Sequence, residues 1–328
     1  MPTRSPARSH AAPASLPQRS RWPESGRLHR TFVPFAPCSL HEPGAFYARN
    51  GMSSPKKTFA AVGFPPPLLG SAPQRLPILE DAPGWLALEK PAGVGTRAHP
   101  WDLGVPDLDQ ALNVQLQAQK PELERLEARL FASIYYLDPD VAGIALFAKH
   151  HEARTDLRNR FGSGEGTFRF CFVAGVAPDG ADEVSADAPL LPHRTKPKMI
   201  PSTAKGKKCR TSFRQLARSA NWACWEARCG FFRAHQVRAH AAVAGIPVMG
   251  DQLYSGPAVP TFSELPSQKK RRTGRDKPVY SDLPLRLCAV ELPSDGPVLQ
   301  LESNPDKYFE LLLKRLELAV PRDCAPDE

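Results

Sequence analysis

From about residue 76 onward, the chain is a succession of short strand-like segments with few helical segments between them. The segment TFRFCFVAGV (167–176) is the clearest, because its phenylalanines alternate with other residues at the period of a β-strand. The apolar spacing predicts helices at 107–119, 150–161 and 234–244, and Asn304-Pro305 is expected to open a terminal helix. Further strands are predicted for RLPILED, GWLALEK, FASIYYL, GIALFAK, KKCRTSFRQLA, WACWEARC, LRLCAVEL and PVLQLES.

This succession of segments predicts the fold class. A doubly wound parallel sheet needs a helix after nearly every strand, and too few helical segments are present here. We therefore predict an α+β fold with a central mixed, largely antiparallel sheet and flanking helices. The chain has 328 residues, of which 41% are hydrophobic, so enough apolar material is present for a core of this kind.

The first 75 residues differ in composition from the rest. They contain ten Lys/Arg against Glu24 and Glu42, and 13 of the 36 prolines, without a helical or strand period. Such a segment cannot bury enough apolar surface to offset its loss of conformational entropy, so we predict that residues 1–75 are disordered. They could assist RNA binding or act as an organelle transit peptide. Alternatively, translation begins at Met52 and residues 1–51 are not part of the protein.

The remaining residues, 76–320, are predicted to form one folded domain, with a basic insertion at 256–282. No apolar run reaches the ~18 residues of a membrane span, and no secretory signal opens the chain, so we expect a cytoplasmic protein. Seven cysteines without a CxxC pair favour neither a disulfide framework nor a zinc site. GxGxxG after a strand, GxxxxGK[ST] and GxSxG are also missing, which leaves dinucleotide, P-loop and α/β-hydrolase enzymes without support.

Two segments could carry chemistry. Asp138 lies in YYLDPDVAG between two apolar strands, where it either hydrogen-bonds its own turn or acts as a catalytic carboxylate. A carboxylate pair of Asp138 and Asp140, as in a hydrolase, is a weaker alternative. In GFFRAHQVRAH, His235 and Arg238 share one face at the start of a helix, which suggests a ligand surface; the alternative is a structural histidine with satisfied hydrogen bonds. His235 and His240 are five residues apart, so they do not form a helical zinc pair.

Basic residues cluster in two further segments. One block lies at 269–275, and the other lies at 194–210 without a single acidic residue. Such blocks attract anions, although each alone is also typical of a solvated loop. The second block consists of Arg194, Lys196, Lys198, Lys205, Lys207, Lys208 and Arg210.

The order of these segments resembles the RluA-type pseudouridine synthase family. The resemblance runs through Lys90-Pro-Ala-Gly, His99-Pro100, Leu137-Asp-x-Asp-x-x-Gly entering IALFAK, Gly206-Lys207, RAHQVRAH and GIPVMGDQLY, over roughly residues 76–302. It implies a catalytic domain with the family's fold that isomerises uridine in rRNA or tRNA to pseudouridine after the base is flipped out. It also implies RNA as the partner and neither a metal nor an organic cofactor. We further expect a monomer.

By the same resemblance, Asp138 is the catalytic residue. The candidates for holding the base or completing the active site are Tyr136, Leu137, Arg169, Phe170 and Arg238. The implied RNA contacts are Lys90, Arg233, His235, Gln236 and the basic residues of 194–210 named above.

The sequence departs from the family pattern at three places. Tyr135 and Tyr136 replace the usual His-Arg before Leu-Asp, and Cys288 replaces a histidine near the end of the match. The family's active-site tyrosine has no clear counterpart, since gap-free alignment selects Arg169 and a one-residue bulge selects Phe170. The alternative to an active enzyme is therefore an RNA-binding module of the same fold with weakened catalysis.

Overall fold

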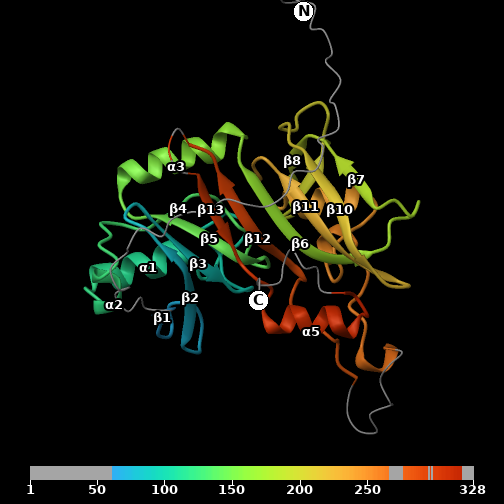
Figure 1. The fold of residues 1–328 in the computed structure, drawn as a ribbon, viewed down its shortest axis with the longest axis horizontal. Coiled ribbons are helices and arrows are strands. Elements are labelled where there is room, and N and C mark those ends of the chain that lie inside the picture. The colour runs from blue at the N-terminus through green and yellow to red at the C-terminus, as the bar shows by residue number, and fades with distance from the viewer. Residues whose placement is uncertain (1–60, 266–275, 295, 297, 320–328) are drawn as a thin grey trace, which may run out of the picture. The chain divides into compact units, whose positions relative to one another are not determined.

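The computed structural model describes residues 61–265, 276–294, 296 and 298–319 (Figure 1). The predicted disorder of residues 1–60 and the central part of the basic insertion, 266–275, lie outside the described residues. No helix in the described part of the chain is both long and apolar enough to cross a membrane.

The described strands form one 11-stranded sheet and one small two-stranded sheet. In the large sheet, the pairing of β12 with β5 is parallel and the other pairings are antiparallel. The prediction of a mixed, largely antiparallel sheet is therefore confirmed. The order in the large sheet is β1 (Ala61–Phe64), β2 (Gln74–Asp81), β3 (Trp85–Lys90), β5 (Ala142–Ala148), β12 (Leu285–Leu292), β6 (Thr167–Gly175), β11 (Trp222–Cys229), β10 (Thr211–Arg218) and β7 (Glu183–Ala186), with β4 (Ala132–Ser133) on β5 and β13 (Leu299–Glu302) on β12; β8 (Leu190–Pro192) and β9 (Met199–Pro201) form the small sheet.

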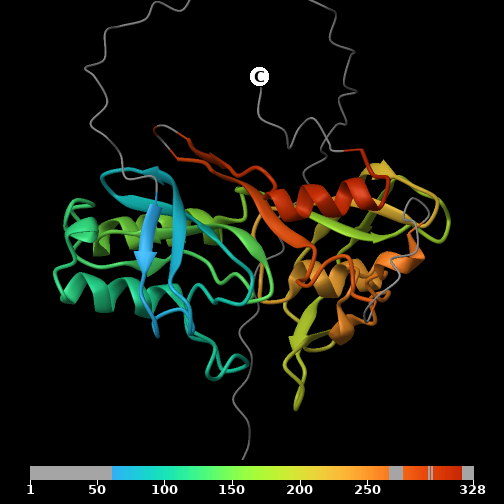
Figure 2. The same cartoon turned by 90° about the horizontal axis from the view of Figure 1, so that it is seen from below.

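Helices cover this sheet on both faces, and strand β6 shows why. Phe168, Phe170 and Phe172 lie in one core cluster with Val237 of α4, whereas Cys171 and Val173 lie in another with side chains of α5. The alternation read from the sequence thus places α4 and α5 on opposite sides of β6 (Figure 2). The helices are α1 (Leu108–Gln117), α2 (Pro121–Glu124), α3 (His151–Ser163), α4 (Gln236–Val243) and α5 (Lys307–Arg315), with short 3-10 turns η1 (Gln252–Tyr254) and η2 (Phe262–Glu264).

Two sequence predictions of local structure need correction. The terminal helix is capped by Asp306 rather than Asn304, since the Asp306 carboxylate accepts hydrogen bonds from the backbone N–H groups of Tyr308 and Phe309 at 2.8 and 2.9 Å. The predicted strand FASIYYL is a strand only at Ala132–Ser133. The residues that follow leave the sheet and run into the loop that carries Asp138.

The predicted disorder of residues 1–75 is wrong for residues 61–75. Val62 and Phe64 of β1 are buried against Leu86 and Leu88 of β3. Gly63 is also tied to the rest of the fold, because its N–H donates to Glu122 at 3.1 Å. This strand is only four residues long, so the basic, proline-rich average over the first 75 residues hid its apolar alternation.

Candidate active site

Asp138 lies in the loop between β4 and β5, and its side chain is only 7% exposed. Its carboxylate accepts two contacts from the backbone N–H of His235, at 3.1 Å to Oδ1 and 3.2 Å to Oδ2. A turn holds the loop, since Val141 N–H donates to the Asp138 carbonyl at 3.0 Å. At Gly143, φ is +111°, and a Cβ would collide with the backbone of Leu287, so only glycine allows β5 to begin beside β12 here.

The ammonium group of Lys90 anchors the loop that carries Asp138. It donates to the carbonyls of Val94, Pro91 and Pro139 at 2.5, 3.0 and 3.1 Å. The residue is fully buried, and burial lowers the pKa of Lys90 to about 7. The prediction that Lys90 contacts RNA is therefore wrong, because its donors are used inside the fold. Lys90 joins the turn after β3 to the loop that carries Asp138.

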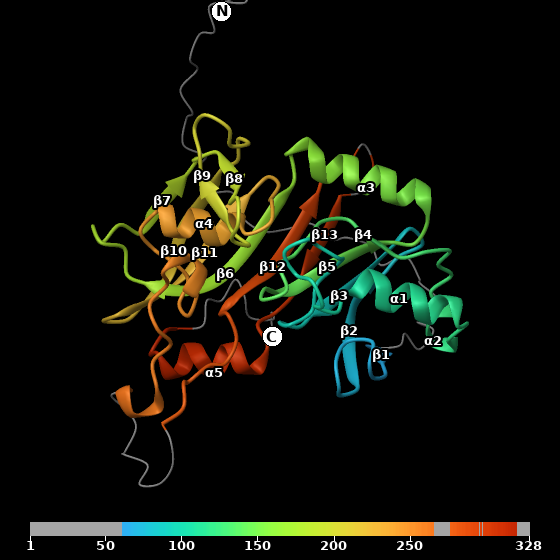
Figure 3. The same ribbon diagram turned by 180° about the vertical axis from the view of Figure 1, so that it is seen from behind.

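His235 lies against Asp138 at the start of α4, which Figure 3 shows in front of β10 and β11. Its φ of +53° turns the backbone N–H toward the carboxylate. The imidazole Nε2 is 3.8 Å from Asp138 Oδ2, and Nδ1 is 3.2 Å from the hydroxyl of Tyr254. Burial lowers the pKa of His235 below its usual value, which favours the neutral ring at neutral pH. Sequence reasoning placed His235 among the RNA contacts, whereas the structure places it at the catalytic candidate.

Arg238 lies one turn further along α4 and also reaches Asp138. Its guanidinium binds Asp251 through two hydrogen bonds of 2.7 and 3.0 Å, and its Nη1 is 3.3 Å from Asp140 and 3.7 Å from Asp138. Burial alone would lower the pKa of Arg238, but the hydrogen bonds to Asp251 and the nearby carboxylates raise it. A permanent positive charge is thus fixed beside Asp138.

Gln236 and Arg233 differ in their surroundings. Gln236 is buried, and its amide accepts from Arg233 N–H at 3.1 Å and donates to the Arg210 carbonyl and the Thr211 hydroxyl, both at 3.2 Å. The prediction that Gln236 binds RNA is wrong, since its amide holds the entry to α4. Arg233 is half-buried with its guanidinium 5.1 Å from the centre of the Phe231 ring.

The two tyrosines before Leu137 have separate environments. Tyr135 is buried in the core, where its hydroxyl donates to the Ile144 carbonyl at 2.9 Å. Tyr136 turns the other way: its hydroxyl donates to Asp102, and its ring centre is 4.5 Å from that of His99. Leu137 itself is buried in the core. Only Tyr136 of the pair therefore lies near the polar groups around Asp138.

Arg169 and Phe170 occupy opposite faces of β6. Arg169 pairs with Glu302 at 2.6 Å and with Glu226 at 3.7 Å, on the face that α5 covers. Its predicted place in the active site is wrong, because alternation along the strand turns it away from α4. Phe170 lies in the same core cluster as Leu137. The place of Phe170 in the active site stays a prediction.

The predicted basic residues surround the β8–β9 hairpin. Lys198 reaches η1, since its ammonium donates to the Leu253 carbonyl at 3.2 Å and lies 5.8 Å from the centre of the Tyr254 ring. The remaining members are exposed: Arg194, Lys196, Lys205, Lys207, Lys208 and Arg210.

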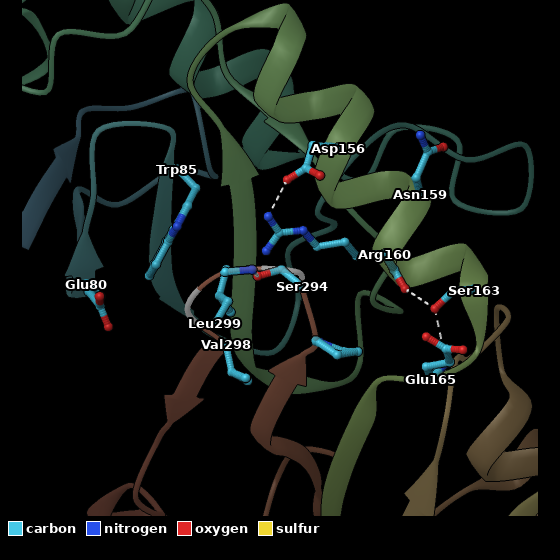
Figure 4. Close-up of a pocket in the computed structure, with 12 residues that line it drawn as sticks. Glu80, Trp85, Asp156, Asn159, Arg160, Ser163, Glu165, Ser294, Val298 and Leu299 are labelled. Carbon is cyan, nitrogen blue, oxygen red and sulfur yellow. Dashed lines mark hydrogen bonds and ion pairs between the residues drawn. The ribbon is translucent and has the colours of Figure 1, made fainter.

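One cavity lies near Asp138, and another lies far from it. The first, of about 590 Å³, is lined by Arg238, which lies beside Asp138, and by Asp140 and Asp251, which pair with Arg238. The other, of about 800 Å³, lies beside α3 and contains none of the predicted site residues. Its wall includes Asp156, which pairs with Arg160 at 2.7 Å, and Figure 4 shows both side chains on α3. Of these two cavities, the one next to Arg238 therefore lies beside the candidate site.

Several site residues received no role from sequence reasoning. Asp251 and Tyr254 stood in the matched segment GIPVMGDQLY, and His99 stood in another matched segment, so their positions were marked without a function. Trp101 and Asp102 directly follow His99-Pro100 and could have been found by extending that segment by two residues.

Comparison with known proteins decides the family. The chain is 30% identical over 245 residues to the ribosomal large subunit pseudouridine synthase D of Haemophilus ducreyi, in an alignment that covers 73% of this chain and 71% of that protein. The chain belongs to the RluA-type RNA pseudouridine synthase family. No family model matches it. The identity with the Haemophilus ducreyi protein confirms the resemblance inferred from the ordered motifs.

Two further similarities agree with this membership of the RluA-type family. An uncharacterized RNA pseudouridine synthase of Synechocystis sp. is 29% identical over 252 residues, which are 75% of this chain and 70% of that protein. The structure of human RNA pseudouridylate synthase domain containing 4 matches with a TM-score of 0.58 at 18% identity, covering 74% of this chain and 94% of that one. The human structure supports the shared fold.

Proposed function

We propose that this protein converts uridine to pseudouridine in RNA, with Asp138 as the catalytic residue and large-subunit ribosomal RNA as the first substrate to test. The choice of RNA rests on the name of the Haemophilus ducreyi relative. The choice of Asp138 rests on one observation: a shielded carboxylate at a loop apex receives the backbone N–H of His235 and lies beside the guanidinium of Arg238. The monomeric state and the cytoplasmic location stay predictions from the sequence.

The reaction is an isomerisation, so its atoms balance without a co-substrate. The bond between N1 and C1′ of uridine breaks, a bond between C5 and C1′ forms, C5 loses a proton and N1 gains one. Asp138 supplies the carboxylate that acts on the sugar or on the base during this exchange. His235 N–H and Arg238 hold that carboxylate in one orientation, which limits the reorganisation that the reaction requires.

The surroundings of α4 offer donors for RNA. Among the described residues, Nε of Arg233 is buried and finds no hydrogen-bond partner, which is a costly state unless an acceptor binds there. A phosphate oxygen is such an acceptor. The exposed lysines around β8–β9 extend the positive charge away from this point. Together they would hold the RNA backbone while the target base enters the site.

The test is a map of pseudouridine in cellular RNA. A strain that lacks the gene should lose pseudouridine at one or a few positions, and wild-type protein should restore them while Asp138→Asn should not. Restoration by both proteins would remove Asp138 from the mechanism. An unchanged map in the deletion strain, together with tight RNA binding by the purified protein, would favour the alternative of an RNA-binding module with weakened catalysis.

Reversing the charge of the lysines at 205–208 should weaken RNA binding and reduce its salt dependence. If Lys205, Lys207 and Lys208 each neutralise a phosphate, the triple Lys→Glu variant should lower the slope of log affinity against log salt by about 2 to 3. The measurement is a series of RNA titrations at several salt concentrations. The matched control reverses Lys307 and Lys314, which are exposed on α5, on the opposite face of the sheet from α4. Equal slopes for the triple variant and wild type would remove these lysines from the interface.

A further inference from the structure

A row of aromatic rings runs past Asp138, from the loop after β3 to helix α4 and η1. Neighbouring ring centres are 4.5 Å apart for Tyr136 and His99, 5.0 Å for His99 and Trp101, 5.2 Å for Trp101 and His235, and 5.8 Å for His235 and Tyr254. His235 is the member that contacts the Asp138 carboxylate. The row therefore places Trp101 one ring away from the catalytic candidate.

Trp101 differs from most of this row in having accessible surface. Tyr136, His235 and Tyr254 are buried, whereas Trp101 and His99 are partly exposed. Trp101 meets the two histidines at steep angles, 75° with His99 and 63° with His235. Neither imidazole thus lies flat on the indole, so neither takes the parallel position in which a planar ring stacks.

The loop that carries Trp101 is tied to the catalytic segment at its neck and on one side. At the neck, Leu137 N–H donates to the Thr96 hydroxyl at 3.1 Å, and Thr96 in turn donates to the Tyr135 carbonyl at 3.3 Å. On one side, Asp102 accepts from the Tyr136 hydroxyl. Trp101 itself packs on one side against the core cluster that contains Ala239 and Tyr254, whereas Leu103 at the tip of the loop is 87% exposed. These contacts fix the position of Trp101 relative to Asp138.

This row of rings adjoins the buried carboxylate of Asp138. The Asp138 side chain is 7% exposed. Trp101 contacts His235, which in turn contacts Asp138. At the other end of the row, Lys198 lies 5.8 Å from the centre of the Tyr254 ring, which places a positive charge for the RNA backbone there. Flat aromatic faces beside a basic strip are the arrangement with which proteins hold unstacked bases of single-stranded RNA.

We propose that Trp101 is a base-stacking residue of the substrate site and that its indole binds a nucleobase of the RNA beside Asp138. This inference rests on the proposed function for the identity of the ligand as RNA. It assigns the stacking surface to the loop after β3. A planar aromatic side chain is then needed at position 101, whereas an aliphatic one of similar bulk cannot replace it.

The experiment uses the full chain and a single-stranded oligouridylate. Trp101→Leu should bind the oligonucleotide about tenfold to a hundredfold more weakly than wild type. Trp101→Phe should bind within about threefold of wild type, because a phenyl ring still stacks. RNA should quench tryptophan fluorescence in wild type, and Trp101→Phe should lose that quenching although it still binds. If Trp101 had only a structural role, RNA binding would not change its fluorescence.

Two control variants isolate the effect. Leu103→Ala changes the exposed tip of the same loop, and Trp85→Phe removes an indole that lines the cavity of Figure 4; both should bind and quench like wild type. Melting curves of all variants check that the fold is retained. Wild-type affinity in Trp101→Leu, or full quenching in Trp101→Phe, would overturn the proposal.

The outcome is separable from that of the proposed function. Quenching at Trp101 with no pseudouridine formed by wild type would support the stacking site and contradict the catalytic assignment. Normal pseudouridine formation with unchanged binding in Trp101→Leu would contradict the stacking site and leave the catalytic assignment standing.

Discussion

Asp138→Asn is expected to lower the rate of pseudouridine formation by about ten-thousand-fold or more while RNA affinity stays within about threefold of wild type. Asparagine keeps an oxygen that accepts the His235 N–H, so the loop should keep its conformation. It removes the charge that attacks the substrate or takes its proton. Single-turnover rates and RNA titrations on the same preparation separate the two effects.

The matched control for this variant is Asp156→Asn. Asp156 is an aspartate of α3 that pairs with Arg160, and its side chain is 53% exposed, so its loss should change neither rate nor affinity measurably. An Asp138→Asn protein that forms pseudouridine at the wild-type rate would show that another group carries the chemistry. A tenfold or larger loss of RNA affinity would show that Asp138 acts in binding.

Of the variants considered, Asp251→Asn should lower the free energy of unfolding the most. The Asp251 side chain is completely buried and holds Arg238 through two hydrogen bonds of 2.7 and 3.0 Å. Removing its charge leaves a buried guanidinium with Asp138 at 3.7 Å and the largely exposed Asp140 at 3.3 Å. Breaking a buried pair in this way costs about 3 to 5 kcal/mol of the free energy of unfolding. In a domain of this size that corresponds to a melting temperature lower by roughly 6 to 20 °C.

This expectation is checked by thermal unfolding of Asp251→Asn beside Asp282→Asn. Asp282 lines the 590 Å³ cavity that Asp251 also lines, but its side chain is exposed. Its variant should therefore melt within a few degrees of wild type. Activity should also fall in Asp251→Asn, because Arg238 then turns toward Asp138 and the catalytic carboxylate loses its orientation. Equal melting temperatures for the two variants would mean that Asp251 does not stabilise Arg238.

The sequence was informative wherever one residue's neighbours along the chain decide its environment. The alternation of β6 predicted the strand, and it also separates Phe170 from Arg169 once the faces of the sheet are known. The glycine and turn pattern around Asp138 likewise predicted a loop between apolar segments. The ordered motifs predicted the family, although each of them alone is short.

The sequence was less informative wherever burial depends on residues far along the chain. The backbone N–H of His235 reaches Asp138 across 97 positions, and nothing local indicates that contact. Lys90 and Gln236 looked like RNA contacts because lysine and glutamine are usually exposed, yet both are buried with their donors satisfied by backbone carbonyls. The separation of Tyr135 from Tyr136 depends in the same way on the core beneath one and on Asp102 beside the other.

Release of tritium from RNA labelled at C5 of uridine tests the central claim most directly, because C5 must lose its hydrogen when the new C–C bond forms. Purified wild-type protein in excess over RNA from the deletion strain should release tritium in proportion to the unmodified target sites, and Asp138→Asn should release none above background. Release by both proteins, or by neither, would contradict the assignment of Asp138 as the residue that makes pseudouridine.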